Sequence, residues 1–220
     1  YVASKEEKKE IIKDTVLIDS NLTTELSLNN KDVKKLYNYV NNKNIDYASY
    51  KNRGKKLSWD YLSLVTMYNI PQNYVLKDEK NIEYVDSYSF LDKYREIFGS
   101  DLTISKEEQN TTTCGAVNYK NDVYYPNWYC KEKSDDSIIV TYLKNVTIDK
   151  EYLNINKYYA FIVKTDENTF DLYSSDEKEE KTLIATNLSI YEISNYINEM
   201  NIMSYRFKKI NNQYYLNNIK

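Results

Sequence analysis

Residues 58–69 read SWDYLSLVTMYN and decide the character of the N-terminal half of this 220-residue chain. The polar strip left between the apolar and aromatic side chains of this stretch is narrow and consists of Asp60, Ser63 and Thr66. A helix that is apolar almost all round is typical of a buried position. Ser58 can cap its first turn, and Pro71 cannot continue it. We therefore expect this helix at the centre of a helical part.

Similar signals predict a helix on each side of this one. The earlier helix follows Asn29 as its cap and carries an apolar stripe with i, i+3, i+4, i+7 spacing, made of Val33, Leu36, Tyr37 and Val40. The asparagine-rich run 41–44 ends it. The later helix starts at Asp86 and stops at Gly99, because glycine commonly ends helices. Three helices are therefore expected.

Four cations fall within six residues between the first two predicted helices: Lys51, Arg53, Lys55 and Lys56. A basic cluster of this kind can face an anionic lipid or a wall polymer. A solvated loop between two helices is the other interpretation of this cluster, and it is the one that we expect.

Beyond Asp101 the hydrophobic period changes to two, which is typical of strands. The predicted strands cover residues 137–148, 158–164 and 169–173, and a closing hairpin covers residues 205–216. Ser189 and Glu192 have the spacing of a capping box, which predicts a helix before that hairpin. The predicted fold class is α+β: a three-helix N-terminal part packed against a C-terminal antiparallel β-sheet with one additional helix.

These patterns divide the chain into three parts. Residues 1–25 have mixed charge and few large apolar side chains, so we expect a charged spacer, either a stalk or a frayed terminus. Residues 26–102 form the predicted helical subdomain, and residues 103–220 form the β-rich subdomain. The β-rich subdomain begins with a predicted hairpin at 114–130, which two cysteines bracket.

Composition excludes several kinds of chemistry. The chain has no histidine, which removes Ser-His-Asp catalysis, Cys-His catalysis and zinc sites that need an imidazole. Its three scattered glycines cannot form a phosphate-binding loop. A formal net charge of −3 argues against a nucleic-acid-binding surface, which needs clustered cations. We predict no metal, no cofactor and no nucleic-acid partner.

Cys114 and Cys130 flank a segment that reads as a hairpin with a turn at residues 120–122. A hairpin brings its two ends together, within the Cα separation of about 4.4–6.8 Å that a disulfide requires. Closing this loop contributes about 3 kcal/mol on the chain-entropy account of disulfide stabilisation. We predict a structural disulfide; the alternative is two buried free thiols in a reducing compartment.

Aromatic side chains gather inside the same loop, and three of them are candidate ligand contacts: Tyr124, Tyr125 and Trp128. Aromatic faces stack on sugars and contact peptides with little loss of rotamer entropy. The alternative is that alternate rings of this hairpin simply cover the core of the sheet.

For an enzyme, the remaining option is a carboxylate pair of the glycosidase type. Four glutamates lie beside apolar segments and are candidates for such a pair: Glu83, Glu96, Glu151 and Glu192. The acid-rich run 166–181 lacks the glycine and the alternating oxygen ligands of a calcium loop. We expect an exposed acidic loop there.

Two strings carry a resemblance to a known family. Residues 26–30 (LSLNN) lead into Val33 and the Leu36-Tyr37 pair, and residues 84–87 (YVDS) lead into the Ile97-Phe98-Gly99 end of a helix. Over about residues 26–130 the chain resembles an uncharacterised family of extracytoplasmic proteins from AT-rich Gram-positive bacteria. Members of that family carry an N-terminal anchor or lipoprotein signal, a helical part, a cysteine-bearing segment and a β-rich end. The family often has glycines around its second cysteine, whereas Tyr129 and Lys131 flank Cys130 here.

The resemblance implies a location rather than a reaction. It implies an extracytoplasmic protein that is tethered to the cell membrane only through an N-terminal anchor removed from this chain. We expect a non-enzymatic binding or scaffolding module whose partner is an unknown surface ligand, a glycan or a protein. The alternative is a carboxylate-dependent hydrolase of cell-surface glycan.

Overall fold

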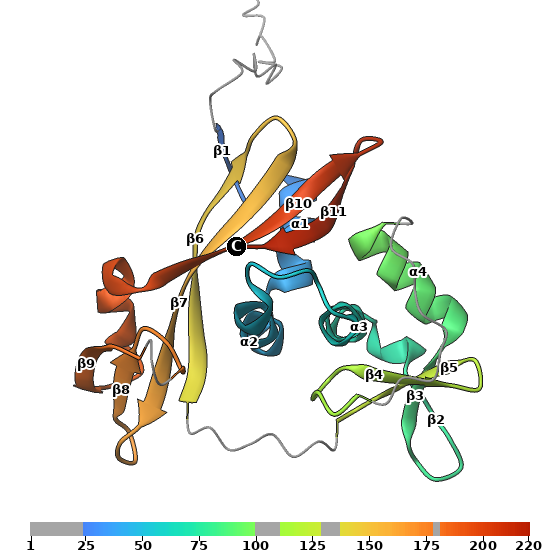
Figure 1. The fold of residues 1–220 in the computed structure, drawn as a ribbon, viewed down its shortest axis with the longest axis horizontal. Coiled ribbons are helices and arrows are strands. Elements are labelled where there is room, and N and C mark those ends of the chain that lie inside the picture. Colours follow the sequence, from blue (N-terminus) through green and yellow to red (C-terminus); the bar gives the residue numbers. More distant parts are fainter. Residues whose placement is uncertain (1–23, 100–110, 129–136, 178–180) are drawn as a thin grey trace, which may run out of the picture.

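The computed structural model describes residues 24–99, 111–128, 137–177 and 181–220, and its architecture is α+β as predicted (Figure 1). Helices from the N-terminal half lie against a large antiparallel sheet, most of which comes from the C-terminal half. A smaller sheet lies at the far side of the helices. In the described part of the chain, no helix is both long enough and apolar enough to cross a membrane.

The large sheet has the strand order β1-β6-β7-β10-β11, and β8 and β9 extend it from the end of β7. Its described strands are β1 (Thr24–Leu26), β6 (Ser137–Ile148), β7 (Tyr152–Lys164), β8 (Phe170–Tyr173), β9 (Leu183–Leu188), β10 (Asn201–Ile210) and β11 (Gln213–Ile219). The predicted strands at 137–148, 158–164 and 169–173 all belong to it. The predicted closing hairpin turns at Asn211 and Asn212, whose φ angles of 48° and 64° are the left-handed values that a two-residue hairpin turn needs.

The N-terminal part of the described chain holds four α-helices where the pattern predicted three: α1 (Lys31–Val40), α2 (Lys43–Asn52), α3 (Trp59–Tyr68) and α4 (Ser87–Phe98). The predicted caps at Ser58 and Asp86 both accept a hydrogen bond from a backbone amide of their helix. The prediction for α1 is wrong by one residue, because its cap is Asn30 and not Asn29. The helix that the pattern did not predict is α2. The asparagine run that ends α1 also starts α2, because the side chain of Asn42 accepts a hydrogen bond from the amide of Asn44.

The small sheet has the strand order β2-β3-β5-β4. Its strands are β2 (Leu76–Lys77), β3 (Glu83–Asp86), β4 (Val117–Lys120) and β5 (Val123–Pro126). The predicted hairpin after Cys114 is present as β4 and β5. Because β3 pairs with β5, strand pairing crosses the boundary predicted at residue 102. A short 3₁₀ helix, η1 (Gln72–Tyr74), precedes this sheet.

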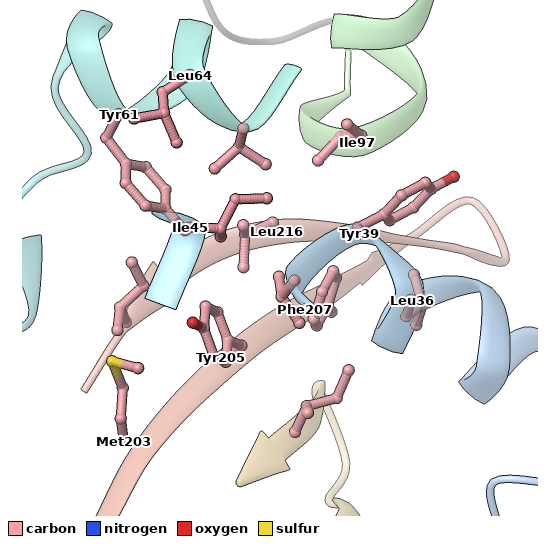
Figure 2. Close-up of a cluster of buried hydrophobic side chains, with 14 of the residues drawn as sticks. Leu36, Tyr39, Ile45, Tyr61, Leu64, Ile97, Met203, Tyr205, Phe207 and Leu216 are labelled. Atoms are coloured by element: carbon pink, nitrogen blue, oxygen red, sulfur yellow. The ribbon is translucent and has the colours of Figure 1, made fainter. Parts of the chain in front are cut away.

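The largest hydrophobic core lies between the helices and one face of the large sheet. Figure 2 shows Leu36 of α1, Ile45 of α2 and Leu64 of α3 directed toward side chains of β10 and β11. The helix layer and the sheet therefore share one core.

The other face of the large sheet is covered near β8 and β9 by a separate cluster that includes Ile162, Leu172 and Ile193. Ile193 is the first residue of η2 (Ile193–Glu199). The helix predicted after Ser189 lies at this place and is a 3₁₀ helix. The capping contact is present, because the amide of Ser189 donates to Glu192 over 2.9 Å.

Candidate functional site

A cleft of about 630 Å³ lies between α2, α3, residues 112–114 and the start of β6. Its α2 wall is formed by side chains at i, i+3, i+4, i+7 spacing, namely Asn44, Tyr47, Ala48 and Lys51. Its α3 wall is formed by Asp60, Tyr61, Leu64 and Tyr68, which also share one face of their helix. Two neighbouring helices thus present one continuous face each to the same space.

Hydrogen bonds fix the polar groups of these walls. The side-chain amide of Asn44 donates to the hydroxyl of Tyr68 over 2.7 Å and so joins the two helices across the cleft. Thr113 donates to a carboxylate oxygen of Asp60 over 2.5 Å, which holds residues 112–114 against α3. The wall combines rings, amides and hydroxyls in fixed positions, the mixture that ligand pockets use to bind and orient a molecule.

Gly115 permits the close approach of the hairpin to α3. Its φ is +77°, and a Cβ there would lie 2.8 Å from a ring carbon of Tyr68. The ring of Trp128 meets the ring of Tyr68 edge on, with 5.3 Å between the centroids. Trp128 therefore lies directly behind a side chain that lines the cleft.

An acidic residue after β8 contacts two side chains that line the cleft. The sequence analysis did not predict this contact. Asp176 has a side chain only 4% exposed, and its carboxylate lies 2.9 Å from the ammonium of Lys51. Tyr47 also donates to Asp176, over 3.2 Å. The prediction of an exposed acidic loop is therefore wrong at Asp176. The prediction of a solvated basic loop is wrong at Lys51, because this residue belongs to α2.

A buried polar cluster lies next to the cleft, centred on Asp46 of α2 and Lys157 of β7. Their side chains are 3% and 1% exposed, and the ammonium lies 2.8 Å from a carboxylate oxygen. The same oxygen accepts from Tyr205 over 2.5 Å, and the other accepts from Thr141 over 2.7 Å. Lys157 also donates to the carbonyl of Val40 over 2.6 Å. One cluster thus ties the end of α1 and the start of α2 to three strands.

Burial shifts the pKa values of Lys157 and Tyr205. Loss of hydration lowers the pKa of Lys157, and the neighbouring Asp46 carboxylate opposes that change. Loss of hydration, followed by the charge of Asp46, raises the pKa of Tyr205 well above its usual value. The ammonium and the phenol are both enclosed, so the cluster acts as a structural link between helices and sheet.

The three aromatic candidates do not form one surface. Tyr124 is fully buried and stacks on Phe90, with ring centroids 3.9 Å apart, so its ring is not available to a ligand. For Tyr124 the alternative holds, since it covers the core. Tyr125 points to the opposite face of the small sheet, where it lies 6.0 Å from the ring of Tyr84. Trp128 is partly buried and donates to Glu83 over 3.0 Å.

The four candidate glutamates are not brought together. Glu96 of α4 accepts from Tyr39 over 2.7 Å and lies 2.8 Å from the ammonium of Lys35, and Lys93 contacts its other oxygen. Burial alone would raise the pKa of Glu96, but these hydrogen bonds outweigh it and lower the pKa to about 2.

The other three glutamates have separate places. Glu83 pairs with Trp128 on β3, Glu192 caps the segment at 189–192, and Glu151 is exposed between β6 and β7. The described residues contain no group of three or more acidic or cysteine side chains that could hold a metal ion.

Cys114 lines the cleft, and Cys130 lies outside the described residues. The disulfide between them therefore stays a prediction.

We compared the chain with protein-family models, with curated proteins and with solved structures, and none of the three comparisons finds a match.

Proposed function

We propose that this protein is a non-enzymatic binding module of the bacterial cell surface and that its ligand occupies the cleft between α2 and α3. The observation that carries the proposal is the cleft itself. Its volume of about 630 Å³ lies within the range of about 300–1,000 Å³ that small-ligand pockets have. Its two helical walls carry aromatic rings, side-chain amides and hydroxyls.

The arrangement of acids favours binding over glycan hydrolysis. A glycosidase needs two carboxyl groups about 5–10 Å apart, one of them with a raised pKa. Among the described residues that line the cleft, Asp60 is the acidic one, and Thr113 already donates to it. Glu96 has a pKa that is lowered, the opposite of what a general acid requires.

The proposed location is extracytoplasmic, with a membrane tether ahead of this chain. Its support is the family resemblance of residues 26–130 and the predicted disulfide between Cys114 and Cys130, since such bonds persist in oxidising compartments. Thiol titration of unfolded, unreduced protein from an oxidising compartment tests it: no free thiol is expected, and two free thiols would remove this support.

A variant that fills the cleft tests the binding proposal. Ala48 lies on the α2 wall, so Ala48→Arg places a long side chain inside the cleft. Asn38→Arg is the matched control, because it adds the same side chain at an exposed position of α1, a helix that does not line the cleft. The probes are soluble wall glycan fragments and linear peptides selected from a random library, and tryptophan fluorescence is the readout.

Wild type and Asn38→Arg are expected to bind one probe with equal affinity, and Ala48→Arg is expected to lose that binding. Equal binding by both variants would put the ligand elsewhere. Absence of binding to either kind of probe, or release of reducing ends from the glycan, would overturn the proposal.

A further inference from the structure

Strand β6 has an unpaired edge. It pairs with β7 along its length, from Ser137 opposite Val163 to Ile148 opposite Leu153. On its other side, β1 covers only the far end, at residues 146–148. Within the described ranges, no strand pairs with this side of β6 over residues 137–143. Seven consecutive residues therefore lack a strand neighbour on that side.

The sequence of this edge carries none of the usual protection. Residues 137–143 read SIIVTYL, with β-branched and aromatic side chains, no charge and no proline. Proteins normally protect exposed edges with lysine, proline, bulges or a covering element, because an open edge recruits other strands. The first charge, Lys144, and the irregularity between Leu143 and Asn145 come only after this segment.

The first three residues of the unpaired edge lie at the cleft described above. Ser137, Ile138 and Ile139 line it, opposite the walls made by α2 and α3. Ile138 is 53% exposed, whereas the neighbouring Ile139 is buried in the core. Two kinds of surface therefore border the cleft. One is the mixed apolar and polar side chains of α2 and α3, and the other is the start of strand β6.

We infer that the ligand of the cleft is an extended peptide segment that adds a strand to β6 along residues 137–143. This inference rests on the proposed binding function and names its ligand class. An added strand satisfies backbone donors and acceptors at the spacing of a sheet, which a glycan chain cannot reproduce. Alternate side chains of the peptide then face the helix walls, where Tyr47 and Leu64 give apolar contact.

Charge around the cleft favours a peptide with an acidic side chain. Lys43 is exposed at the first position of α2 and lines the cleft, next to the positive end of that helix. Asp60, the acid on the opposite wall, is already held by Thr113. The cleft therefore presents a cation without an equally available anion.

Backbone methylation of the peptide tests strand addition without changing the protein. A linear peptide is selected from a random phage-displayed library on the whole chain and then synthesised with N-methyl groups on alternate amides. In an added strand only every second amide faces β6. We expect that methylating one set of alternate amides abolishes binding and that methylating the other set leaves the affinity within about threefold of the parent peptide.

A matched pair of protein variants tests the position. Ile138→Lys puts a charge on the edge, and Ile202→Lys puts the same charge on β10 at an isoleucine that is 45% exposed and does not line the cleft. Ile138→Lys is expected to weaken binding of the selected peptide by about tenfold or more, because lysine blocks edge pairing, and Ile202→Lys is expected to leave it unchanged. Far-UV circular dichroism checks that both variants are folded.

The outcomes separate this inference from the proposed function. If both methylated peptides bind alike, or if both lysine variants bind alike, strand addition is wrong. If only wall glycan binds, and Ala48→Arg abolishes that binding, the cleft is a binding site and the peptide inference alone fails. A dimer in sedimentation that Ile138→Lys converts to monomer would assign the edge to a second copy of the chain and overturn the inference.

Discussion

Lys157 and Asp46 lie 111 positions apart in the sequence, and both side chains are almost fully buried. The pair supports the helix layer through three partners, Tyr205, Thr141 and the carbonyl of Val40. Neither residue has a local pattern around it that predicts such a role. The sequence could therefore not reveal this contact, because a charge pair of this kind forms only when distant segments meet.

Removing one member of this pair should be more damaging than removing both. Asp46→Ala leaves a buried ammonium without its anion and is expected to destabilise the fold by about 3–5 kcal/mol in urea unfolding. The double variant Asp46→Leu with Lys157→Met removes both charges and should be less destabilised than Asp46→Ala. If the double variant is the less stable of the two, the pair contributes net attraction and this account of the cluster is wrong.

Glu96 gives a pH dependence with a defined sign. Its pKa is lowered to about 2 in the fold, from 4.5 when unperturbed. A group with a lowered pKa stabilises the fold above its unfolded pKa, and that stability is lost as pH falls toward the folded pKa. Glu96→Gln should therefore lower the melting temperature at pH 6, and the difference from wild type should shrink between pH 4.5 and about 2.

Glu151→Gln is the control for this profile, because Glu151 is an exposed glutamate between two strands. Thermal melts of the three proteins at several pH values give the comparison. A constant difference between Glu96→Gln and wild type from pH 6 to about pH 2 would contradict the role given to Glu96.

At the scale of elements, local signals were sufficient where one residue fixes a turn or an end. The caps Ser58 and Asp86 and the turn asparagines of the closing hairpin act within three or four residues of themselves. Helix α2 could not be predicted in this way, because its sequence KNIDYASYKN mixes polar and apolar side chains without a wide apolar stripe. Packing on the sheet through Ile45 and Tyr50, a long-range effect, defines that helix.

Helix α3 shows the energetic consequence of a buried element. Leu62 is 8% exposed in the core between the helices and the large sheet. Leu62→Ala is expected to cost about 2–5 kcal/mol of unfolding free energy. Leu183→Ala makes the same change at a leucine of β9 that is 49% exposed, and it is expected to cost less than about 1 kcal/mol. Equal losses in urea titrations of the two variants would show that the core is misassigned.

Strand alternation explains why the aromatic candidates were only partly predictable. Successive residues of a strand point to opposite faces, so Tyr124 and Tyr125 had to separate. The sequence does not say which face the helices cover. The structure puts Tyr124 against Phe90 of α4 and Tyr125 on the outer face.

At the scale of the whole molecule, the cleft is made by four segments that are far apart in the chain: α2, α3, residues 112–114 and the start of β6. The pattern of each segment alone indicates at most its secondary structure and does not indicate that the four segments meet. The α+β class followed from periodicity alone, whereas the cleft depends on how the helix layer seats against the edge of the large sheet. Its free edge at β6 is a property of strand order, which periodicity does not contain.

Amide hydrogen exchange shows whether the ligand lies in the cleft. Exchange is measured on the whole chain with and without a saturating amount of whichever probe binds, the wall glycan fragments or the selected peptide. We expect slower exchange in α2 and α3 with either probe, and also over residues 137–143 if the probe is the peptide. Protection confined to the outer face of the small sheet, around Tyr84 and Tyr125, would contradict it.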